Sequence, residues 1–506
     1  MAEARQKWGS KLGIILAVAG SAVGLGNFLR FPVQAAQNGG GAFLIPYFIS
    51  FVLLGIPLMW IEWAIGRHGG LFGHGSAPLI LNRLWKHRLA KYLGVVGVFG
   101  PVVIFLYYTY IESWLLGYAF FSLTGQLFAV VTPEAMKGFL STYQGLAPGS
   151  NLTTAYIFFL LTFLINFYFI YRGLQGGIEL FCKIAMPILF LFGLILAIRV
   201  LMLPNIIGGF GFLWNPDFSV LTSAKVWMAA AGQIFFTLSV GIGVILTYAS
   251  YLKKGDDIAL SGLTAASTNE MAEVVLGGSI VIPAAFVFFG AAGATAAANS
   301  GAFNLGFVTM PLIFGQIELG GFFALLWFTL LFLAGITSSV SLLAPAVAFF
   351  YDDFGVTRKK AVIWLGGILF FLCQFPVFFL GQGVVDELDF WGGTFSLVLF
   401  GTIETIIFVW FFGIEKAWDE IHSGAEMSIP WFYKPIIRYV TPVFLLFILG
   451  FWFFQQGLPV ILMQGVPAAN QPYVLATRLG LILLFIAIAL AVRIAYYRKK
   501  RAGEME

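Results

Sequence analysis

Apolar runs of about 20 residues recur along the whole chain and are separated by short polar segments. Runs of this length are sufficient for a helix to cross the hydrocarbon core of a bilayer. They cover residues 41–66, 154–171, 178–203, 274–298, 322–350, 361–380, 394–412, 440–456 and 474–494. A run near 93–123 and two glycine-interrupted segments raise the expected number of spans to about twelve.

These runs are continuously apolar, whereas the strands of a membrane barrel alternate apolar and polar positions. Composition agrees, because 60% of the 506 residues are hydrophobic and only 10% are charged. A soluble domain carries about 25% charged residues, so this chain cannot cover itself with a polar surface. No charged or Pro/Ser-rich linker divides it. We therefore predict an all-α integral membrane protein with one domain, 1–506.

Basic residues gather in a few short segments, and their placement predicts the orientation of the chain. Lys and Arg cluster within 5–11, 83–91, 253–254, 358–360 and 498–501. With an even number of spans all five segments fall on one side, which the positive-inside rule makes cytoplasmic. We therefore expect a multi-pass protein of the cell membrane with both termini in the cytoplasm. The net charge of +5 is then explained by topology and does not indicate a nucleic-acid partner.

Two predicted spans are interrupted by glycines at their centres. The sequence GSAVGLG occupies 20–26 in the first span, and SVGIG occupies 239–243 in the sixth. Matching interruptions in two halves of a transporter indicate an inverted repeat with a binding site at the bilayer midplane. Close helix packing is the alternative for either cluster alone, because glycine is common in membrane helices. Unwinding would free carbonyls that suit a sodium ion and amides that suit a carboxylate.

Polar residues within the spans are candidates for function, because they are expensive to place in a membrane. The charged ones are Arg30, Glu62, Glu112, Glu270, Glu273, Asp389 and Glu404. We expect Arg30 and Asp389 to form an outer gate, and Arg5 and Asp352 an inner one. For Glu62, Glu112 and Glu404 structural pairing is the favoured interpretation. The uncharged ones include Asn27, Thr237, Asn269, Thr337 and Ser338, although hydroxyls often only bond their own helix.

The chain carries no motif for catalysis or nucleotide binding. It has no Walker lysine, GxSxG, HExxH or CxxC sequence, and no polar segment is long enough for a soluble nucleotide domain. We therefore predict that it is not an enzyme, and that any energy for transport comes from an ion gradient.

Eight motifs resemble those of the neurotransmitter:sodium symporters, and the closest likeness is to a bacterial leucine-transporting member. They are GSAVGLGNFLRFP (20–32), NGGGAFLIPY (38–47), GIPLMWIEWAIGR (55–67), YYTYIESW (107–114), GQIFFTLSVGIGVILTYASY (232–251), NEMAEVVLGGS (269–279), AGITSSVSLL (334–343) and DELDFWGGT (386–394). The resemblance implies twelve transmembrane helices with a five-plus-five inverted repeat. Repeat one covers about 11–203, repeat two about 225–412, and two further helices about 432–497.

The resemblance also implies two sodium sites. The first uses the Ala22 carbonyl, Asn27, Thr237, Asn269 and the carboxylate of the substrate. The second uses the carbonyls of Gly20, Val23 and Ala334 and the hydroxyls of Thr337 and Ser338. Because one ion shares a ligand with the substrate, each should raise the affinity for the other by the same factor.

The same resemblance implies a substrate site for a neutral, mainly aliphatic amino acid. Its residues are Ala22, Gly24, Leu25, Gly26, Ile104, Tyr108, Phe236, Thr237, Ser239, Ile242, Ser338 and Leu342. Monoamine-carrying relatives have Asp where this chain has Gly24, so glycine favours a substrate with its own carboxylate. Ile104, Ile242 and Leu342 replace Val, Phe and Ile of the leucine-transporting member, which leaves the pocket apolar and uncharged. Ser21, which replaces an Asn, has no clear consequence.

Glu273 and the gates complete the expected site. Chloride-dependent relatives have a neutral residue at the position of Glu273, so its carboxylate predicts chloride-independent transport and is a candidate for proton counter-movement. Tyr108 and Phe236 should close over the pocket below Arg30 and Asp389. On the inner side the gate should comprise Arg5, Trp8, Ser250, Tyr251 and Asp352. A sensor or a channel of the same fold remains the alternative to a transporter, and the oligomeric state stays open.

Overall fold

The computed structural model describes residues 5–503, and every regular element in this part of the chain is helical. Within it, ten helical stretches are long and apolar enough to cross a membrane. They are Gly41–Gly70, Ala90–Leu123, Thr153–Tyr171, Leu174–Leu201, Ala259–Asn299, Gly320–Asp353, Arg358–Phe378, Val384–Phe411, Tyr433–Ile461 and Gln471–Arg501. The predicted all-α membrane fold is confirmed.

The two remaining spans are the interrupted ones. The first consists of α1 (Lys11–Ala22) and a second helical piece, Gly26–Gln37, which is bent away by 48°. The sixth consists of α12 (Ala224–Thr237) and the short α13 (Val244–Ala249). With the ten continuous stretches, these two spans agree with the twelve that the sequence predicts.

Each continuous span consists of one or more regular helices. These are α3 (Leu44–Ser50), α4 (Ile56–Gly70), α6 (Ala90–Leu93), α7 (Val96–Leu123), α9 (Thr153–Tyr171), α10 (Leu180–Leu201), α14 (Ala259–Glu270), α15 (Gly278–Asn299), α18 (Gly320–Ala348), α19 (Arg358–Phe378), α20 (Val384–Leu388), α21 (Ser396–Ile406), α23 (Tyr433–Pro435), α24 (Thr441–Trp452), α25 (Leu458–Ile461) and α26 (Gln471–Arg501). The first span also contains α2 (Phe31–Gln37), and the connections contain α5 (Ala77–Leu84), α8 (Pro133–Tyr143), α11 (Ile206–Trp214), α16 (Ala302–Asn304), α17 (Met310–Phe314) and α22 (Ile414–His422).

The seventh and tenth spans begin earlier than their apolar runs. The seventh was expected over 274–298 but starts at Ala259, and the tenth was expected from 394 but starts at Val384. Both added stretches carry polar side chains that the fold buries, such as Asn269 and Glu387. Hydropathy therefore underestimates these helices because their polar residues face protein and not lipid.

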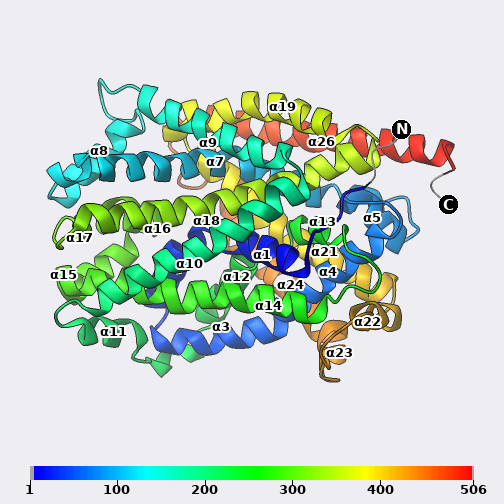
Figure 1. The fold of residues 1–506 in the computed structure, drawn as a ribbon, viewed down its shortest axis with the longest axis horizontal. Coiled ribbons are helices and arrows are strands. Elements are labelled where there is room, and N and C mark those ends of the chain that lie inside the picture. The colour runs from blue at the N-terminus through cyan, green and yellow to red at the C-terminus, as the bar shows by residue number, and fades with distance from the viewer. Residues whose placement is uncertain (1–4, 504–506) are drawn as a thin grey trace.

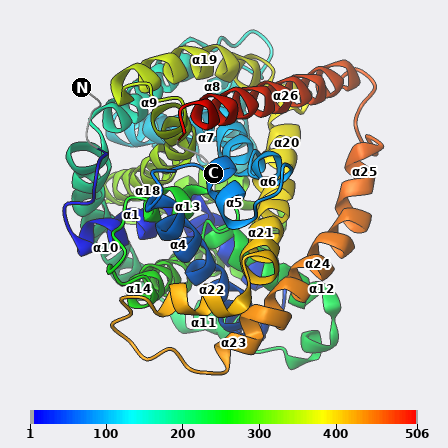
Figure 2. The same cartoon turned by 90° about the vertical axis from the view of Figure 1, so that its right-hand side faces the viewer.

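The core of the molecule surrounds the interrupted spans. Figure 1 shows α1 and α13 in the middle of the long bundle, with the first and last described residues at the same end. In the third span 94% of the most apolar stretch is buried, whereas in the last span only 17% is buried. Seen end-on, α24, α25 and α26 lie at the periphery (Figure 2). The last two spans therefore lie at the outside of the bundle, and the third and eighth, which pack along each other as α7 and α18, form the centre.

Candidate functional site

The two breaks lie next to each other and are held by side chains. At the first, α1 ends at Ala22 and the chain turns at Val23 with φ −72° and ψ 98°. The freed carbonyl of Ser21 accepts hydrogen bonds from the hydroxyls of Ser239 at 2.9 Å and Ser338 at 3.1 Å. The amide of Gly24 donates to Asn27 Oδ1 at 2.8 Å. Backbone groups that would be orphaned in lipid are thus satisfied by neighbouring spans.

The second break is longer and has a different backbone conformation. Ser239, Gly241 and Gly243 all have positive φ angles, of 54°, 77° and 75°. Gly241 also passes close to the tenth span, because a Cβ there would lie 2.3 Å from the Leu397 carbonyl oxygen. Its amide donates a hydrogen bond to the carboxylate of Glu62 on α4. Glu62 thus holds the sixth break through a backbone amide, which is a structural contact of a different kind from the pairing that the sequence predicts.

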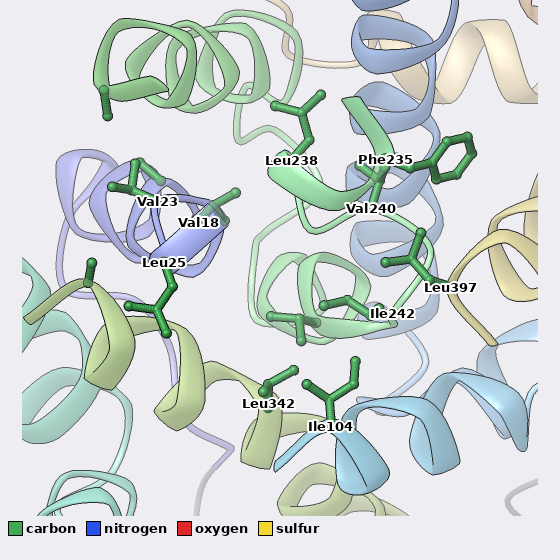
Figure 3. Packing of buried hydrophobic residues seen from close by; sticks show 14 of the residues in the cluster. Val18, Val23, Leu25, Ile104, Phe235, Leu238, Val240, Ile242, Leu342 and Leu397 are labelled. Atoms are coloured by element: carbon green, nitrogen blue, oxygen red, sulfur yellow. The ribbon is translucent and has the colours of Figure 1, made fainter. Parts of the chain in front are cut away.

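A cavity of about 90 Å³ lies between the breaks, and every residue predicted to bind substrate lines it. Figure 3 shows Ile104, Ile242 and Leu342 converging from three elements. The full lining is Ser21, Ala22, Gly24, Leu25, Gly26, Asn27, Ile104, Tyr107, Tyr108, Phe236, Thr237, Ser239, Ile242, Ser338, Ser341, Leu342, Gly393 and Leu397. None of these side chains is charged.

Sequence reasoning gave no role to five members of this lining. They are Ser21, Tyr107, Ser341, Gly393 and Leu397. Ser341 could have been found, because it lies three residues after Ser338 and so shares its helix face. Gly393 lies in the family-like motif DELDFWGGT (386–394), which gave it no specific role, and no signal marked Leu397, whose apolar stretch resembles that of any membrane helix.

The residues predicted for the first sodium site are brought together. Asn27 Nδ2 lies 3.1 Å from Thr237 Oγ1 and 2.8 Å from Asn269 Oδ1. One terminal atom of the Asn269 amide lies 3.2 Å from the carbonyl oxygens of both Ala22 and Thr237. This cluster of amide, hydroxyl and carbonyl oxygens is suited to a hard cation. Among residues 5–503 no group of three His, Cys, Asp or Glu side chains could hold a metal, which separates the cluster from transition-metal sites.

Glu273 lies directly against this cluster. Its carboxylate is fully buried and accepts hydrogen bonds from Asn27 at 2.9 Å, Gln233 at 2.7 Å and Tyr47 at 3.2 Å. It also accepts one from the Thr237 hydroxyl. Two of the four donors are themselves predicted sodium ligands, so the carboxylate is one side chain away from that site.

The residues predicted for the second sodium site meet between α1 and α18. The Ser338 hydroxyl lies 3.4 Å from the Gly20 carbonyl oxygen and 3.1 Å from that of Ala334. The Thr337 hydroxyl lies 3.0 Å from the Ala334 carbonyl oxygen. A Cβ on Gly20 would lie 3.2 Å from that of Thr337, so glycine is what lets the helices approach. Val23 follows at the end of α1, where the chain leaves the helix.

The residues predicted for the inner gate lie together in this structure. Arg5 pairs with Asp352 at 3.3 Å and donates to Ser250 Oγ at 3.1 Å. Its guanidinium also lies 4.9 Å from the centre of the Tyr251 ring. Trp8 donates to the Tyr248 carbonyl at 2.9 Å. The end of the bundle that carries the segment before α1 is therefore closed by contacts from this segment to the sixth and eighth spans.

The outer pair behaves differently, because Arg30 and Asp389 do not form an ion pair in this structure. The Arg30 guanidinium lies 4.2 Å from the centre of the Phe236 ring, and Asp389 accepts a hydrogen bond from Tyr107 at 2.6 Å. Both side chains line a second cavity of about 330 Å³ that also includes Tyr108 and Phe236. Tyr108 and Phe236 line both cavities, and that they close over the pocket stays a prediction.

Known proteins resemble this chain over most of its length. The model of the sodium:neurotransmitter symporter family matches residues 5–133 and 136–499. An uncharacterised sodium-dependent transporter of Methanocaldococcus jannaschii is 31% identical over 451 residues, covering 87% of this chain and 89% of its own. One from Haemophilus influenzae is 30% identical over 464 residues, covering 88% and 97%. The sodium-dependent serotonin transporter of Drosophila melanogaster is 26% identical over 494 residues, covering 88% and 76%.

A solved structure extends the likeness to the fold. The crystal structure of MhsT in complex with L-phenylalanine has a TM-score of 0.75 and 32% sequence identity, covering 88% of this chain and 99% of that one. The sequence, the fold and the named relatives all indicate sodium-dependent transport across a membrane, and none of them indicates an enzyme. The chain therefore belongs to the sodium:neurotransmitter symporter family.

Proposed function

We propose that the chain is a symporter that couples a neutral, mainly aliphatic amino acid to two sodium ions by alternating access. The observation that carries this proposal is the uncharged lining of the cavity between the breaks. A zwitterion brings both of its charges with it. Its carboxylate would meet sodium and the amides of Leu25 and Gly26, and its ammonium would meet carbonyls of the two breaks.

Gly24 supports an amino acid over an amine. An amine substrate would enter this cavity with a positive charge and no carboxylate, and no lining side chain could balance that charge. A Cβ on Gly24 would lie 3.0 Å from Ser338 Oγ and 3.3 Å from Tyr108 Oη. A side chain at position 24 would therefore occupy space that the substrate needs. The L-phenylalanine bound in the related structure also favours an amino acid.

Sharing of one oxygen between substrate and ion explains the coupling. The carboxylate would complete the first sodium site, which Asn27, Thr237 and Asn269 build from one side. Substrate and sodium would then each raise the affinity for the other by the same factor. The second site, between α1 and α18, would connect sodium to the position of α1, whose inner end carries the gate.

Glu273 supports independence from chloride. A buried carboxylate one side chain from the first sodium site supplies the negative charge that an anion would otherwise bring. We expect equal sodium-driven uptake in chloride and gluconate media. Replacement of Glu273 by Ser should lower uptake in gluconate, with partial recovery in chloride. Strict chloride dependence of the unmodified protein would refute this part of the proposal.

Uptake by purified protein in liposomes tests the whole proposal. Under an inward sodium gradient we expect saturable accumulation of labelled neutral amino acids, with potassium in place of sodium as the control. A panel of aliphatic, aromatic and charged amino acids and two monoamines would define the class. A channel would give sodium current without accumulation, and a sensor would bind substrate without moving it. Either result would overturn the proposal.

A further inference from the structure

A pair of serine hydroxyls interrupts the otherwise apolar part of the substrate cavity. Ser21 Oγ, from the end of α1, lies 2.7 Å from Ser341 Oγ on α18. Both residues line the cavity, and both are almost fully buried, with 3% and 1% of their surface exposed. Two hydroxyls from different spans thus meet at the wall of the cavity, near Leu342, which is adjacent to Ser341 in the chain.

Counting hydrogens shows what this pair offers to a ligand. The Ser341 hydroxyl donates its single hydrogen to the Ser338 carbonyl at 2.6 Å. The hydrogen between the two serines must then come from Ser21. Ser21 Oγ accepts no hydrogen bond from any other residue between 5 and 503, so its lone pairs are free. Ser21 Oγ can therefore accept a hydrogen bond from a donor group on the ligand.

The other hydroxyls around the cavity already have a role in the breaks, the predicted sodium site or the expected binding of the substrate backbone. The Tyr107 hydroxyl donates to Asp389 at 2.6 Å, and the Tyr108 hydroxyl is the one expected to meet the substrate carboxylate. The hydroxyls of Ser239 and Ser338 both donate to the Ser21 carbonyl and so belong to the break in the first span. Thr237 donates to Glu273 within the first predicted sodium site. The remaining wall is built by Ile104, Ile242 and Leu342. The Ser21–Ser341 pair is thus the hydroxyl group of the cavity to which neither the breaks, the predicted sodium site nor the expected binding of the substrate backbone assigns a role, and it is available to a polar atom on the substrate side chain.

We propose that the Ser21–Ser341 pair accepts a hydrogen bond from the substrate side chain, which makes small hydroxylated amino acids, threonine above all, substrates of this transporter. This inference rests on the proposed function and narrows its substrate class. Threonine has nearly the shape of valine and differs by a hydroxyl in place of a methyl group. A site with a hydrogen-bond acceptor that lacks a donor favours threonine, whereas a purely apolar site favours valine.

Competition between these two amino acids tests the inference on the unmodified protein. Sodium-dependent binding of labelled alanine to the full chain in liposomes would be displaced by L-threonine or by L-valine. We expect threonine to bind at least as tightly as valine. In Ser21→Ala the apparent affinity for threonine should fall about tenfold relative to valine, since the hydroxyl that accepts the hydrogen bond is lost. Ser341→Ala removes the partner that orients the Ser21 hydroxyl and should lower the same ratio by a smaller factor.

Ser122→Ala is the matched control, because Ser122 on α7 is buried but bonds only the Tyr118 carbonyl of its own helix. It should leave the threonine-to-valine ratio unchanged, and retained valine binding would show that the cavity variants are folded. Valine binding far better than threonine in the unmodified protein, or an unchanged ratio in both cavity variants, would overturn the inference and leave the proposed function intact. Absence of sodium-dependent binding of every amino acid would instead overturn both.

Discussion

The two interrupted spans differ in how their breaks are built. The first break covers only residues 23–25, and none of them has a positive φ angle. The sixth break covers 238–243 and includes three residues with positive φ angles. The first is held by short polar side chains that also line the cavity. The sixth is held by the carboxylate of Glu62, which does not line the cavity and accepts a hydrogen bond from the Gly241 amide.

This difference suggests different roles for two segments that look alike in sequence. The first break turns its carbonyls and amides toward the cavity, where Ser21, Ala22 and Gly24 form part of the lining. The sixth break is fixed to α4 and to the tenth span by contacts that no ligand could replace. We infer that the first break changes its conformation when ligands bind. The sixth break stays fixed and forms a rigid frame next to which the first one moves.

The largest expected effect comes from adding one methyl group to the sixth break. In Gly241→Ala the new Cβ would lie 2.3 Å from the Leu397 carbonyl oxygen, at a φ angle of 77° that alanine disfavours. We expect transport to be abolished and the folded state to be destabilised by about 3 kcal/mol. Thermal unfolding in detergent would measure the stability, and uptake would measure the transport.

Gly24→Ala provides the contrast in the first break. Its Cβ would meet the movable Ser338 hydroxyl at 3.0 Å, and its backbone conformation is open to alanine. Thermal stability should therefore stay near that of the unmodified protein while substrate affinity falls. An equal loss of thermal stability in Gly241→Ala and Gly24→Ala would contradict the difference in role between the sixth and the first break.

The alternation of spans and the polar residues of the site were predictable, but the difference between the breaks was not. Asn27 and Thr237 stood out because polar side chains are rare in apolar spans, and the structure brings them together. The positive φ of Ser239 and the contact of Glu62 with Gly241 depend on how distant spans pack. The same holds for Arg30, which faces Phe236 here although its charge predicts a partner in Asp389.

Glu62 tests whether the sixth break depends on its support. Glu62→Ala would leave the buried amide of Gly241 without an acceptor, which costs about 2 kcal/mol. Glu62→Gln keeps an acceptor oxygen and should lose less. We expect the order unmodified, Gln, Ala in thermal stability, with transport falling in parallel. If both variants were as stable as the unmodified protein, the sixth break would need no such support.

Asn27 tests whether the first break responds to ions. Asn27→Ala removes an amide that lies against Thr237 and Asn269, so the apparent affinity for sodium should fall about tenfold, or about 1.4 kcal/mol. Sodium titration of substrate binding would measure it. Asn38→Ala is the control, because the Asn38 side chain bonds only Gln34 on the same helix. A sodium affinity that is unchanged in Asn27→Ala would show that the first predicted site lies elsewhere.

Arg5 tests whether the inner half of the first span moves as a unit. Arg5→Ala removes the pair with Asp352 and should favour inward-open states, which lowers uptake about fivefold if the shift is near 1 kcal/mol. Cys182 reports the movement, because it is buried against Gly20 of α1 and would become open to a cytoplasmic thiol reagent. The measurement is made with Cys373 replaced by Ala, and Lys7→Ala, which removes an exposed charge beside Arg5, is the control. Faster labelling of Cys182 in Arg5→Ala but not in Lys7→Ala would show that α1 moves away from the sixth break. Equal labelling and equal uptake in Arg5→Ala and Lys7→Ala would contradict a gate at Arg5.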